Sequence, residues 1–149
     1  MAMDVSTVIE IDRPREEVAA FASDPANATE WYERIRGVEW NAAKPLGVGS
    51  RIVFVAEFLG RRVDFTYEVT ELVAGERFVM STAEGPFPME TIYVWEDSGA
   101  GGTRMSLRNR GQPKGVSRLA KPLVVGAMRR ANRKDLRRLK SVLEARAQG

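Results

Sequence analysis

The side chains available for chemistry in this sequence are few in kind, because its 149 residues include neither histidine nor cysteine. Without cysteine there is no disulfide, thiolate nucleophile or thiolate metal ligand, and without histidine the commonest general base is missing. Carboxylates are therefore the main candidates for acid–base catalysis. Their spacing does not form the loop pattern of a cation site, so we assign no catalytic residue and expect neither a metal nor a cofactor.

Four carboxylates fall in segments where polar and apolar residues alternate, as on a half-buried strand: Glu57, Asp64, Glu68 and Glu90. Because successive strand side chains point to opposite faces, these carboxylates should face away from the apolar side of a sheet. A one-residue bulge would reverse that placement. The inward phase instead offers neutral hydrogen-bonding groups: Tyr67, Thr82, Tyr93 and Asn109. Such groups, in a shaped cavity, could orient a bound molecule.

The segments that would position these groups are mostly strands. Apolar residues alternate with polar ones over residues 4–11, and six more strand-like segments follow Gly37, separated by short turns. Short connections imply antiparallel pairing, because parallel strands need long crossovers. Between the first strand and Gly37, the prolines at 14 and 25 indicate the starts of two short helices. The six later segments are 38–43, 51–59, 63–70, 77–82, 89–95 and 103–110.

The end of the chain has a different period. From Val116 to Leu143 the apolar residues recur mostly at steps of three and four, which predicts one amphipathic helix of roughly seven or eight turns. Pro122 lies inside this pattern and should end a first turn or kink the helix. Residues 1–149 therefore read as a single α+β domain, in which a curved seven-stranded antiparallel sheet wraps around a long C-terminal helix.

A cavity is expected between these two parts, because a twisted sheet curls away from a straight helix. For each residue predicted to line it, a place in a packed core is the alternative interpretation. The predicted cavity residues are Phe54, Phe65, Tyr67, Met80, Met89, Tyr93, Met105, Leu119, Leu123 and Met128. Trp31 and Phe87 are predicted at the mouth of the cavity.

Charge is unevenly distributed, although the net charge is only +3. Residues 114–149 carry eleven Lys and Arg against two acidic residues. Arg130, Arg133 and Arg137 could dock weakly on an anionic membrane, while a solvated helix face that balances the acidic sheet is the alternative. No nucleic-acid partner is expected, because no aromatic residues interleave with the arginines to stack on bases.

Several segments resemble the START-like, Bet v 1-like superfamily, also called SRPBCC, and within it the polyketide cyclase/dehydrase subgroup. The resemblance covers nearly the whole chain and implies a helix-grip fold, but its motifs are mainly turns and strand patterns. It therefore implies fold more strongly than chemistry. The similar segments are 5–11, 13–18 with Trp31 beyond it, the glycine turn 47–51, 65–71, 102–107, and the closing helix with Leu136 and Leu139.

The resemblance implies binding of a hydrophobic or amphipathic small molecule that is lipid-, polyketide- or sterol-like. Binding without catalysis is the preferred interpretation. The alternatives are a cyclase, aromatase or dehydratase that uses the same cavity, and a protein-interaction or co-chaperone module. The sequence has no apolar stretch of the ~20 residues that span a bilayer and no signal-like start, so we expect a cytoplasmic protein. For its oligomeric state, we expect either a monomer or a homodimer.

Overall fold

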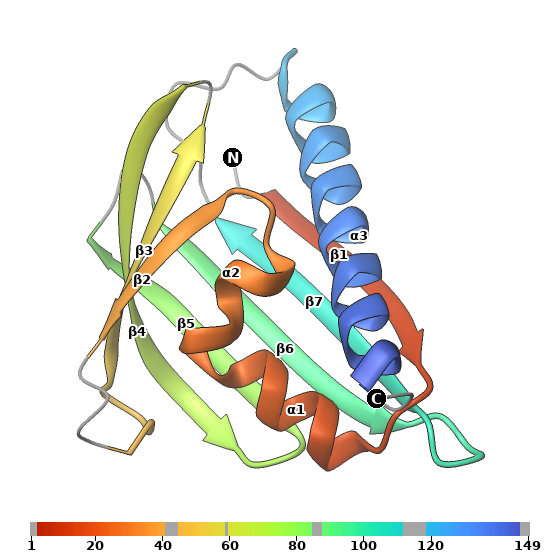
Figure 1. Cartoon of the computed structure of the whole chain (residues 1–149). Helices are drawn as coiled ribbons and strands as arrows, with labels where there is room; N and C mark the ends of the chain where they lie inside the picture. Colours follow the sequence, from red (N-terminus) through yellow and green to blue (C-terminus); the bar gives the residue numbers. More distant parts are fainter. Residues whose placement is uncertain (1–2, 41–44, 59, 85–87, 112–118, 147–149) are drawn as a thin grey trace.

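The computed structural model describes residues 3–40, 45–58, 60–84, 88–111 and 119–146. A strand comes first, then short helical segments, six further strands and one long helix (Figure 1). The helical elements are α1 (Arg15–Ser23), the 3-10 turn η1 (Pro25–Asn27), α2 (Ala28–Trp31) and α3 (Lys121–Arg146). The strands are β1 (Met3–Ile11), β2 (Ile35–Trp40), β3 (Arg51–Phe58), β4 (Arg61–Val73), β5 (Arg77–Glu84), β6 (Met89–Asp97) and β7 (Thr103–Gly111).

The strands form one seven-stranded sheet in the order β1-β7-β6-β5-β4-β3-β2, and every neighbouring pair is antiparallel. Strands β2 to β7 follow one another as a meander, while β1 pairs with the last strand. The predicted α+β fold, with its curved antiparallel sheet and two short helices after the first strand, is confirmed.

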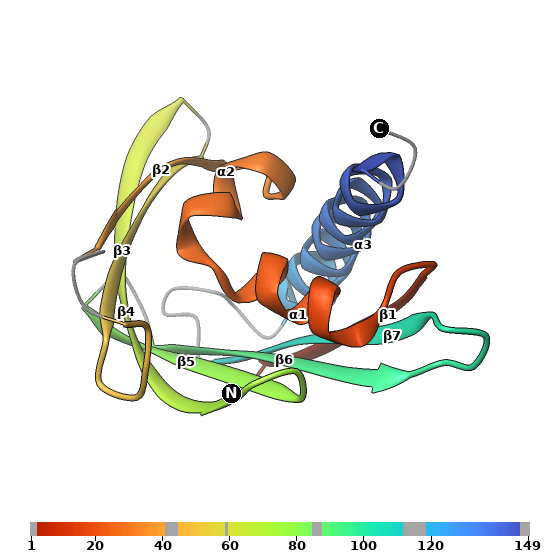
Figure 2. The same ribbon diagram turned by 60° about the horizontal axis from the view of Figure 1, so that its bottom comes forward.

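The sheet curls strongly, and all helices lie on its concave side (Figure 2). Register shifts interrupt the pairing of β4 with β5 between Thr66 and Tyr67 and again between Val69 and Glu71. A further shift interrupts β2 at Ile35. An extra residue on one strand bends that strand and increases the local twist, so these irregularities bring β2, β3 and the start of β4 up beside the helices.

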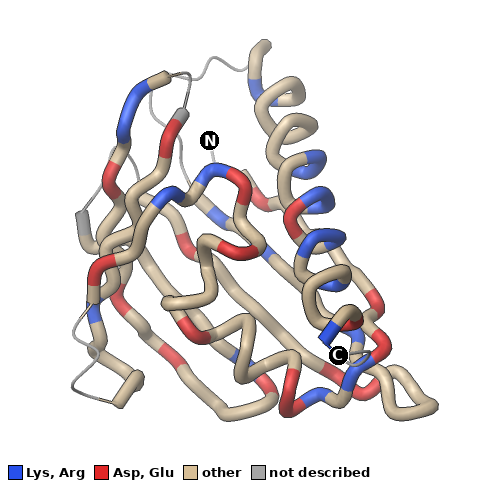
Figure 3. Tube along the Cα trace, in the orientation of Figure 1, with Lys and Arg blue, Asp and Glu red and all other residues tan. Residues whose placement is uncertain are grey.

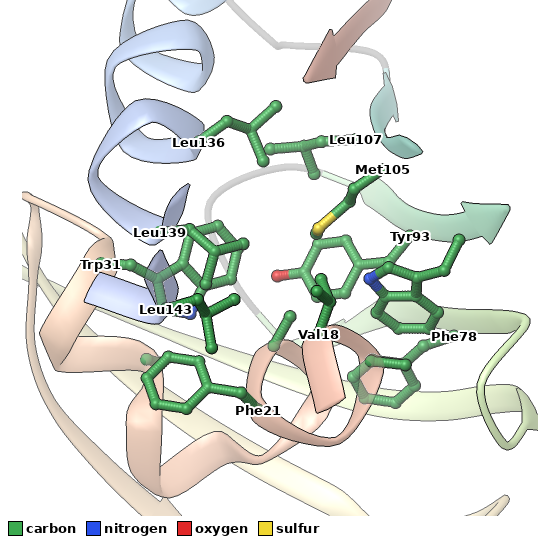
Figure 4. Close-up of a cluster of buried hydrophobic side chains, with 14 of the residues drawn as sticks. Val18, Phe21, Trp31, Phe78, Tyr93, Met105, Leu107, Leu136, Leu139 and Leu143 are labelled. Carbon is green, nitrogen blue, oxygen red and sulfur yellow. The ribbon is translucent and has the colours of Figure 1, made fainter. Parts of the chain in front are cut away.

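The core fills the hollow under the C-terminal half of α3. Leu136, Leu139 and Leu143 are fully buried and meet Trp31 and Phe21 of the short helices in one cluster. Figure 4 shows Tyr93 of β6 within the same cluster, surrounded by side chains from helices and sheet. Under the N-terminal half of α3, a smaller cluster joins Val125 and other residues of the helix to the first residues of β1 and β6.

The predicted start of the long helix needs a correction. α3 begins at Lys121 rather than Val116, and residues 112–118 lie outside the described residues. Pro122 is the second residue of the helix. At that position its missing N–H would have no intrahelical partner in any case, so Pro122 neither ends a turn nor kinks α3.

Candidate functional site

A cavity of about 190 Å³ lies on the concave face of the sheet, beside the junction of α2 and β2. Five strands form its floor, and Tyr32 and Ile35 close it from the side. No charged side chain is among the described residues that line it. The lining residues are Tyr32, Ile35, Phe54, Ala56, Phe65, Tyr67, Met80, Thr91, Tyr93 and Asn109. This pocket, with apolar and neutral polar lining residues, is the candidate site.

All three tyrosines of the sequence line this pocket. The hydroxyl groups of Tyr32 and Tyr93 hydrogen bond to each other, and either can be the donor. The Tyr32 ring stacks on Trp31 with centroids 4.0 Å apart, and Phe54 meets Tyr67 edge to face at 5.6 Å. These aromatic contacts hold the phenol rings in position, so their hydroxyl groups are fixed polar points on an apolar surface.

A second polar feature is a chain of side chains that runs from α3 across the sheet. Asn132 on α3 donates from Nδ2 to Oδ1 of Asn109 over 2.6 Å. Asn109 in turn donates from its Nδ2 to the hydroxyl of Thr91 over 3.0 Å. The Thr91 hydroxyl hydrogen bonds to Tyr67. The pocket therefore contains one end of a hydrogen-bonded relay whose other end is anchored in the buried face of α3.

The tyrosines are held in their neutral form. Burial raises the pKa of Tyr67, and the hydrogen bond from Thr91 opposes that rise. Burial also raises the pKa of Tyr32 and of Tyr93, and the negative charge of Asp135 adds to both shifts. Each phenol therefore keeps its proton at neutral pH and can donate a hydrogen bond.

Asp135 is a carboxylate on the buried face of α3, only 8% exposed. Its Oδ1 accepts a hydrogen bond from the backbone N–H of Glu33 at 3.2 Å. Burial raises the pKa of Asp135 to about 6, although the hydrogen bond from Glu33 favours the charged form. Asp135 does not line the cavity, but its charge is felt at Tyr32 and Tyr93. It is therefore an acidic group placed behind the two phenols.

Half of the ten predicted cavity residues line the pocket together. Their common feature is an inward position on β3, β4, β5 or β6, where the period-two pattern is strong. These five are Phe54, Phe65, Tyr67, Met80 and Tyr93. Of the predicted hydrogen-bonding groups, Asn109 also lines the pocket, whereas the Thr82 hydroxyl is bonded to the backbone of Met89.

The three residues predicted from the last helix lie elsewhere. Leu119 precedes α3 and is 92% exposed, and Leu123 is 77% exposed. At about 100° per residue, Leu123 points almost opposite to Leu136, which defines the buried face. Met128 packs in the small cluster with Met3 and Met89. A series of three- and four-residue steps can move gradually around the helix and leave its inner face. The prediction that Leu119 and Leu123 line the cavity was therefore wrong.

Trp31, predicted at the mouth, is also placed differently, since it is 0% exposed and belongs to the core. Met105 is likewise fully buried in the core. Met89 lines a separate surface hollow of about 600 Å³ at the ends of β1, β5, β6 and β7. That hollow reaches the outer phase of the sheet at Asp4 and Glu90, so its charged rim fits a hydrophobic molecule less well than the pocket does. Phe87 lies outside the described residues.

The strand carboxylates face away from the pocket, in agreement with the period-two pattern. Each forms an ion pair with an arginine on the outer side of the sheet, at distances between 3.0 and 3.6 Å. The pairs are Glu57 with Arg36, Asp64 with Arg62, Glu68 with Arg51 and Glu90 with Arg110. No group of three potential metal ligands occurs among the described residues.

Sequence reasoning missed Tyr32, Thr91, Asn132 and Asp135. Asn132 and Asp135 share the buried face of α3 with Leu136, Leu139 and Leu143. Two polar residues in an apolar stripe are a signal of inward-facing polar groups, and a helical projection would have detected them. Thr91 occupies the inward phase of β6 between Met89 and Tyr93, where a small polar residue is equally informative. The position of Tyr32 depends on the turn that follows α2, where the sequence has no periodic pattern.

The curled sheet, the long helix laid in its hollow and the uncharged pocket on the sheet's concave face define a helix-grip domain. Its sequence matches the model of one family over residues 2–144, the family described as polyketide cyclase / dehydrase and lipid transport. The chain belongs to this family. The polyketide cyclase/dehydrase subgroup inferred from the sequence motifs is thereby confirmed. No match is found among curated proteins.

Solved structures share the fold along nearly the whole chain. TTHA0849 from Thermus thermophilus has a TM-score of 0.80 and 25% identity, with 96% of this chain and 99% of that chain covered. The Zhui aromatase/cyclase from Streptomyces sp. R1128 has a TM-score of 0.81 at 13% identity, with 99% and 96% covered. A START superfamily protein from Mycobacterium smegmatis has a TM-score of 0.71 at 20% identity, with 97% of each chain covered. The last two likenesses concern the fold alone.

Proposed function

We propose that this chain binds a hydrophobic or amphipathic small molecule, lipid-, polyketide- or sterol-like, in the pocket beside the α2–β2 junction. The observation that carries the proposal is a cavity of about 190 Å³ with aromatic and aliphatic walls and no charged lining residue among those described. Membership of a family that includes lipid transport supports it. The volume is below the range typical of drug-sized ligands, roughly 300–1,000 Å³, so a compound of one or two rings fits better than a full sterol.

Burial supplies the affinity in this proposal. Enclosing about 300 Å² of apolar ligand surface at about 25 cal/mol/Å² contributes roughly 7 kcal/mol. Lost translational and rotational freedom costs at least about 4 kcal/mol. The net value corresponds to a dissociation constant of roughly millimolar from burial alone, so tighter binding requires hydrogen bonds from the polar wall.

A variant that fills the cavity tests the proposal. Ala56 lines the pocket on β3, and Ala56→Leu would occupy part of its volume. Ala83 is an exposed alanine on β5, so Ala83→Leu is the matched control. Native mass spectrometry of protein purified from its own host should detect a bound small molecule in the wild type and in Ala83→Leu, and little in Ala56→Leu. Equal retention by all three proteins would contradict a ligand site in this pocket.

Catalysis of the cyclase, aromatase or dehydratase kind is the second candidate function. The hydrogen-bonded hydroxyls of Tyr32 and Tyr93 favour it, because paired neutral phenols can orient a carbonyl compound and donate to an oxygen on which charge develops. A test is turnover of the extracted ligand and of polyketide-like compounds by the wild type and by Tyr93→Phe. Turnover that is lost in Tyr93→Phe while binding persists would support catalysis; no turnover by the wild type would leave carriage as the function.

The protein-interaction alternative is less well supported. It calls for a filled interior beside a large exposed apolar patch, whereas the described interior contains a cavity. A cytoplasmic location and a monomeric or homodimeric state stay predictions. Within the described part of the chain, no helix is both long and apolar enough to cross a membrane.

We also propose that the outer face of α3 docks on the surface of an anionic bilayer. At about 100° per residue, Arg130, Arg133 and Arg137 share one exposed stripe of that helix, and Leu123 lies on the same stripe nearer its N-terminus. Figure 3 shows Lys and Arg recurring along α3. No hydrogen bond or ion pair engages these three guanidinium groups among the described residues. By contrast, neighbouring Lys134 pairs with Glu33 at 3.1 Å. Unpaired cations beside an exposed leucine fit anionic headgroups with shallow apolar insertion.

A further inference from the structure

The relay that begins on α3 has a direction. Asn132 and Asn109 both donate through Nδ2, so the amide of Asn109 uses its oxygen toward α3 and one N–H toward Thr91. A hydroxyl that accepts a hydrogen bond keeps its own proton to donate. Thr91 also lines the cavity beside Tyr67. Both amides therefore donate away from α3, and the Thr91 hydroxyl at the end of the relay keeps its proton.

The end of the relay leaves donors free toward the cavity. Thr91 accepts from Asn109, so the Thr91 and Tyr67 hydroxyls keep at least one O–H proton for a bound molecule, whichever of the two donates to the other. Asn109 has a second amide hydrogen beyond the one given to Thr91. In the Tyr32–Tyr93 pair one hydroxyl donates to the other, and the second keeps its proton. The polar wall thus offers several N–H and O–H donors.

The charge around the pocket is the complementary observation. No cationic side chain lines the cavity among the described residues, and the carboxylate of Asp135 acts on both Tyr32 and Tyr93. An anionic ligand group beside these phenols would be repelled and would lack a counter-charge. A neutral acceptor such as a ketone or ester oxygen meets neither penalty.

We infer that the pocket selects neutral hydrophobic molecules that carry a carbonyl oxygen, in preference to the corresponding hydrocarbons and carboxylate anions. The polarity of the Asn132–Asn109–Thr91–Tyr67 relay sets this preference. The inference rests on the proposed ligand-binding function and adds the chemical class of the ligand. Asn109 is in this view a positioning residue for Tyr67, because it determines which way the Thr91 proton points.

Three probes of similar size test the selection: 1-tetralone as ketone, tetralin as hydrocarbon and 1-naphthoate as anion. Binding is measured by calorimetry at neutral pH. One net hydrogen bond is worth about 3- to 10-fold in affinity, so the ketone should bind at least that much more tightly than tetralin, and the anion most weakly. Equal affinities for the ketone and tetralin, or tighter binding of the anion, would overturn the inference while leaving the pocket as a ligand site. Failure of every probe to bind would overturn the proposed function and the inference with it.

Two variants test the relay itself. Tyr67→Phe removes one of these donors, so the ketone should lose a large part of its advantage over tetralin while tetralin affinity stays within about twofold. Asn109→Asp keeps the size of the side chain but can only accept, so Thr91 must donate to it and Tyr67 must donate to Thr91. The phenol is retained, yet its proton is consumed, and the ketone preference should again decrease.

A control for the added charge comes from the same strand. Ser106→Asp introduces a carboxylate on the outer phase of β7 and should leave the ketone preference unchanged. Circular dichroism and urea unfolding verify that each variant is folded. A folded Asn109→Asp protein that keeps the full ketone preference would show that relay polarity does not select the ligand.

Discussion

The amide nitrogen of Asn132 on α3 lies 2.6 Å from the side-chain oxygen of Asn109 on β7. Asn132 is only 8% exposed, and it lies between the core under Leu136 and the smaller cluster around Val125. This contact therefore joins the helix to the sheet at the boundary between the packed core and the pocket. It ties the position of α3 to the polar wall of the candidate site.

Asn132→Ala should lower the free energy of unfolding by about 1–3 kcal/mol, because it leaves the side-chain oxygen of Asn109, the acceptor in this part-buried hydrogen bond, without its donor. The adjacent Arg133 is exposed, so Arg133→Ala is the control and should change stability by no more than about 0.5 kcal/mol. Urea unfolding with an unchanged m-value provides the measurement. Equal stability of the two variants would mean that water replaces the Asn132 amide without loss.

The tyrosines should resist ionisation in the native state. Burial raises the pKa of Tyr32, Tyr67 and Tyr93, so phenolate absorbance after a rapid jump to about pH 10.5 should be small. The unfolded chain in urea should titrate near the ordinary value of about 10. Because the unfolded state releases protons that the native state keeps, stability should fall as pH rises above about 10. Native absorbance that rises with a midpoint near pH 10 would contradict burial of the phenols.

Asp135→Asn should stabilise the protein at pH 7.5 and change little at pH 4. The pKa of Asp135 is raised to about 6, above the ordinary value of about 3.9. The native state therefore keeps a proton that the unfolded state has lost, and stability declines as pH rises from about 4 to 6. The asparagine can still accept from the Glu33 N–H, so we expect a gain of about 1–2 kcal/mol at pH 7.5. Urea unfolding of both proteins at the two pH values measures it; the same difference at both would exclude titration of Asp135 as the cause.

Leu136→Ala and Leu123→Ala should differ sharply in stability. Leu136 is fully buried in the core, whereas Leu123 is 77% exposed. Removing the buried side chain should cost about 2–5 kcal/mol, and removing the exposed one no more than about 0.5 kcal/mol. Thermal and urea unfolding can compare the two directly. A large loss in Leu123→Ala would indicate that this leucine packs inward after all.

Vesicle binding should depend on the outer stripe of α3. Co-sedimentation with vesicles containing phosphatidylserine should exceed that with phosphatidylcholine alone and should fall with salt. Each reversal Arg130→Glu, Arg133→Glu or Arg137→Glu should weaken binding at least about fivefold, because it removes a cation worth about 1 kcal/mol and adds a repelled carboxylate. Arg61→Glu, an exposed position on β4, is the control. Unaltered vesicle binding in the triple variant, or a preference for duplex DNA over vesicles, would rule out this docking surface.

The periodic parts of the chain were predictable from the sequence. Alternation placed Phe54, Phe65 and Tyr67 on the concave face because a strand has only two faces, and the register shifts in β4 did not turn these three side chains outward. The absence of histidine and cysteine was equally decisive, since it limited the polar wall to phenols, hydroxyls, amides and carboxylates.

What the amino-acid sequence determined by itself was the order of the elements, the phase of the strands and the kinds of side chain that face inward. Only the tertiary structure decided which inward positions became core and which became pocket. Trp31 and Met105 are buried where the sheet meets α1 and α3, whereas Ala56 and Asn109 border free space. The physical reason is that local periodicity sets the face of a residue, but the distance between facing layers depends on sheet curvature and helix rotation, and contacts far apart in the chain control both.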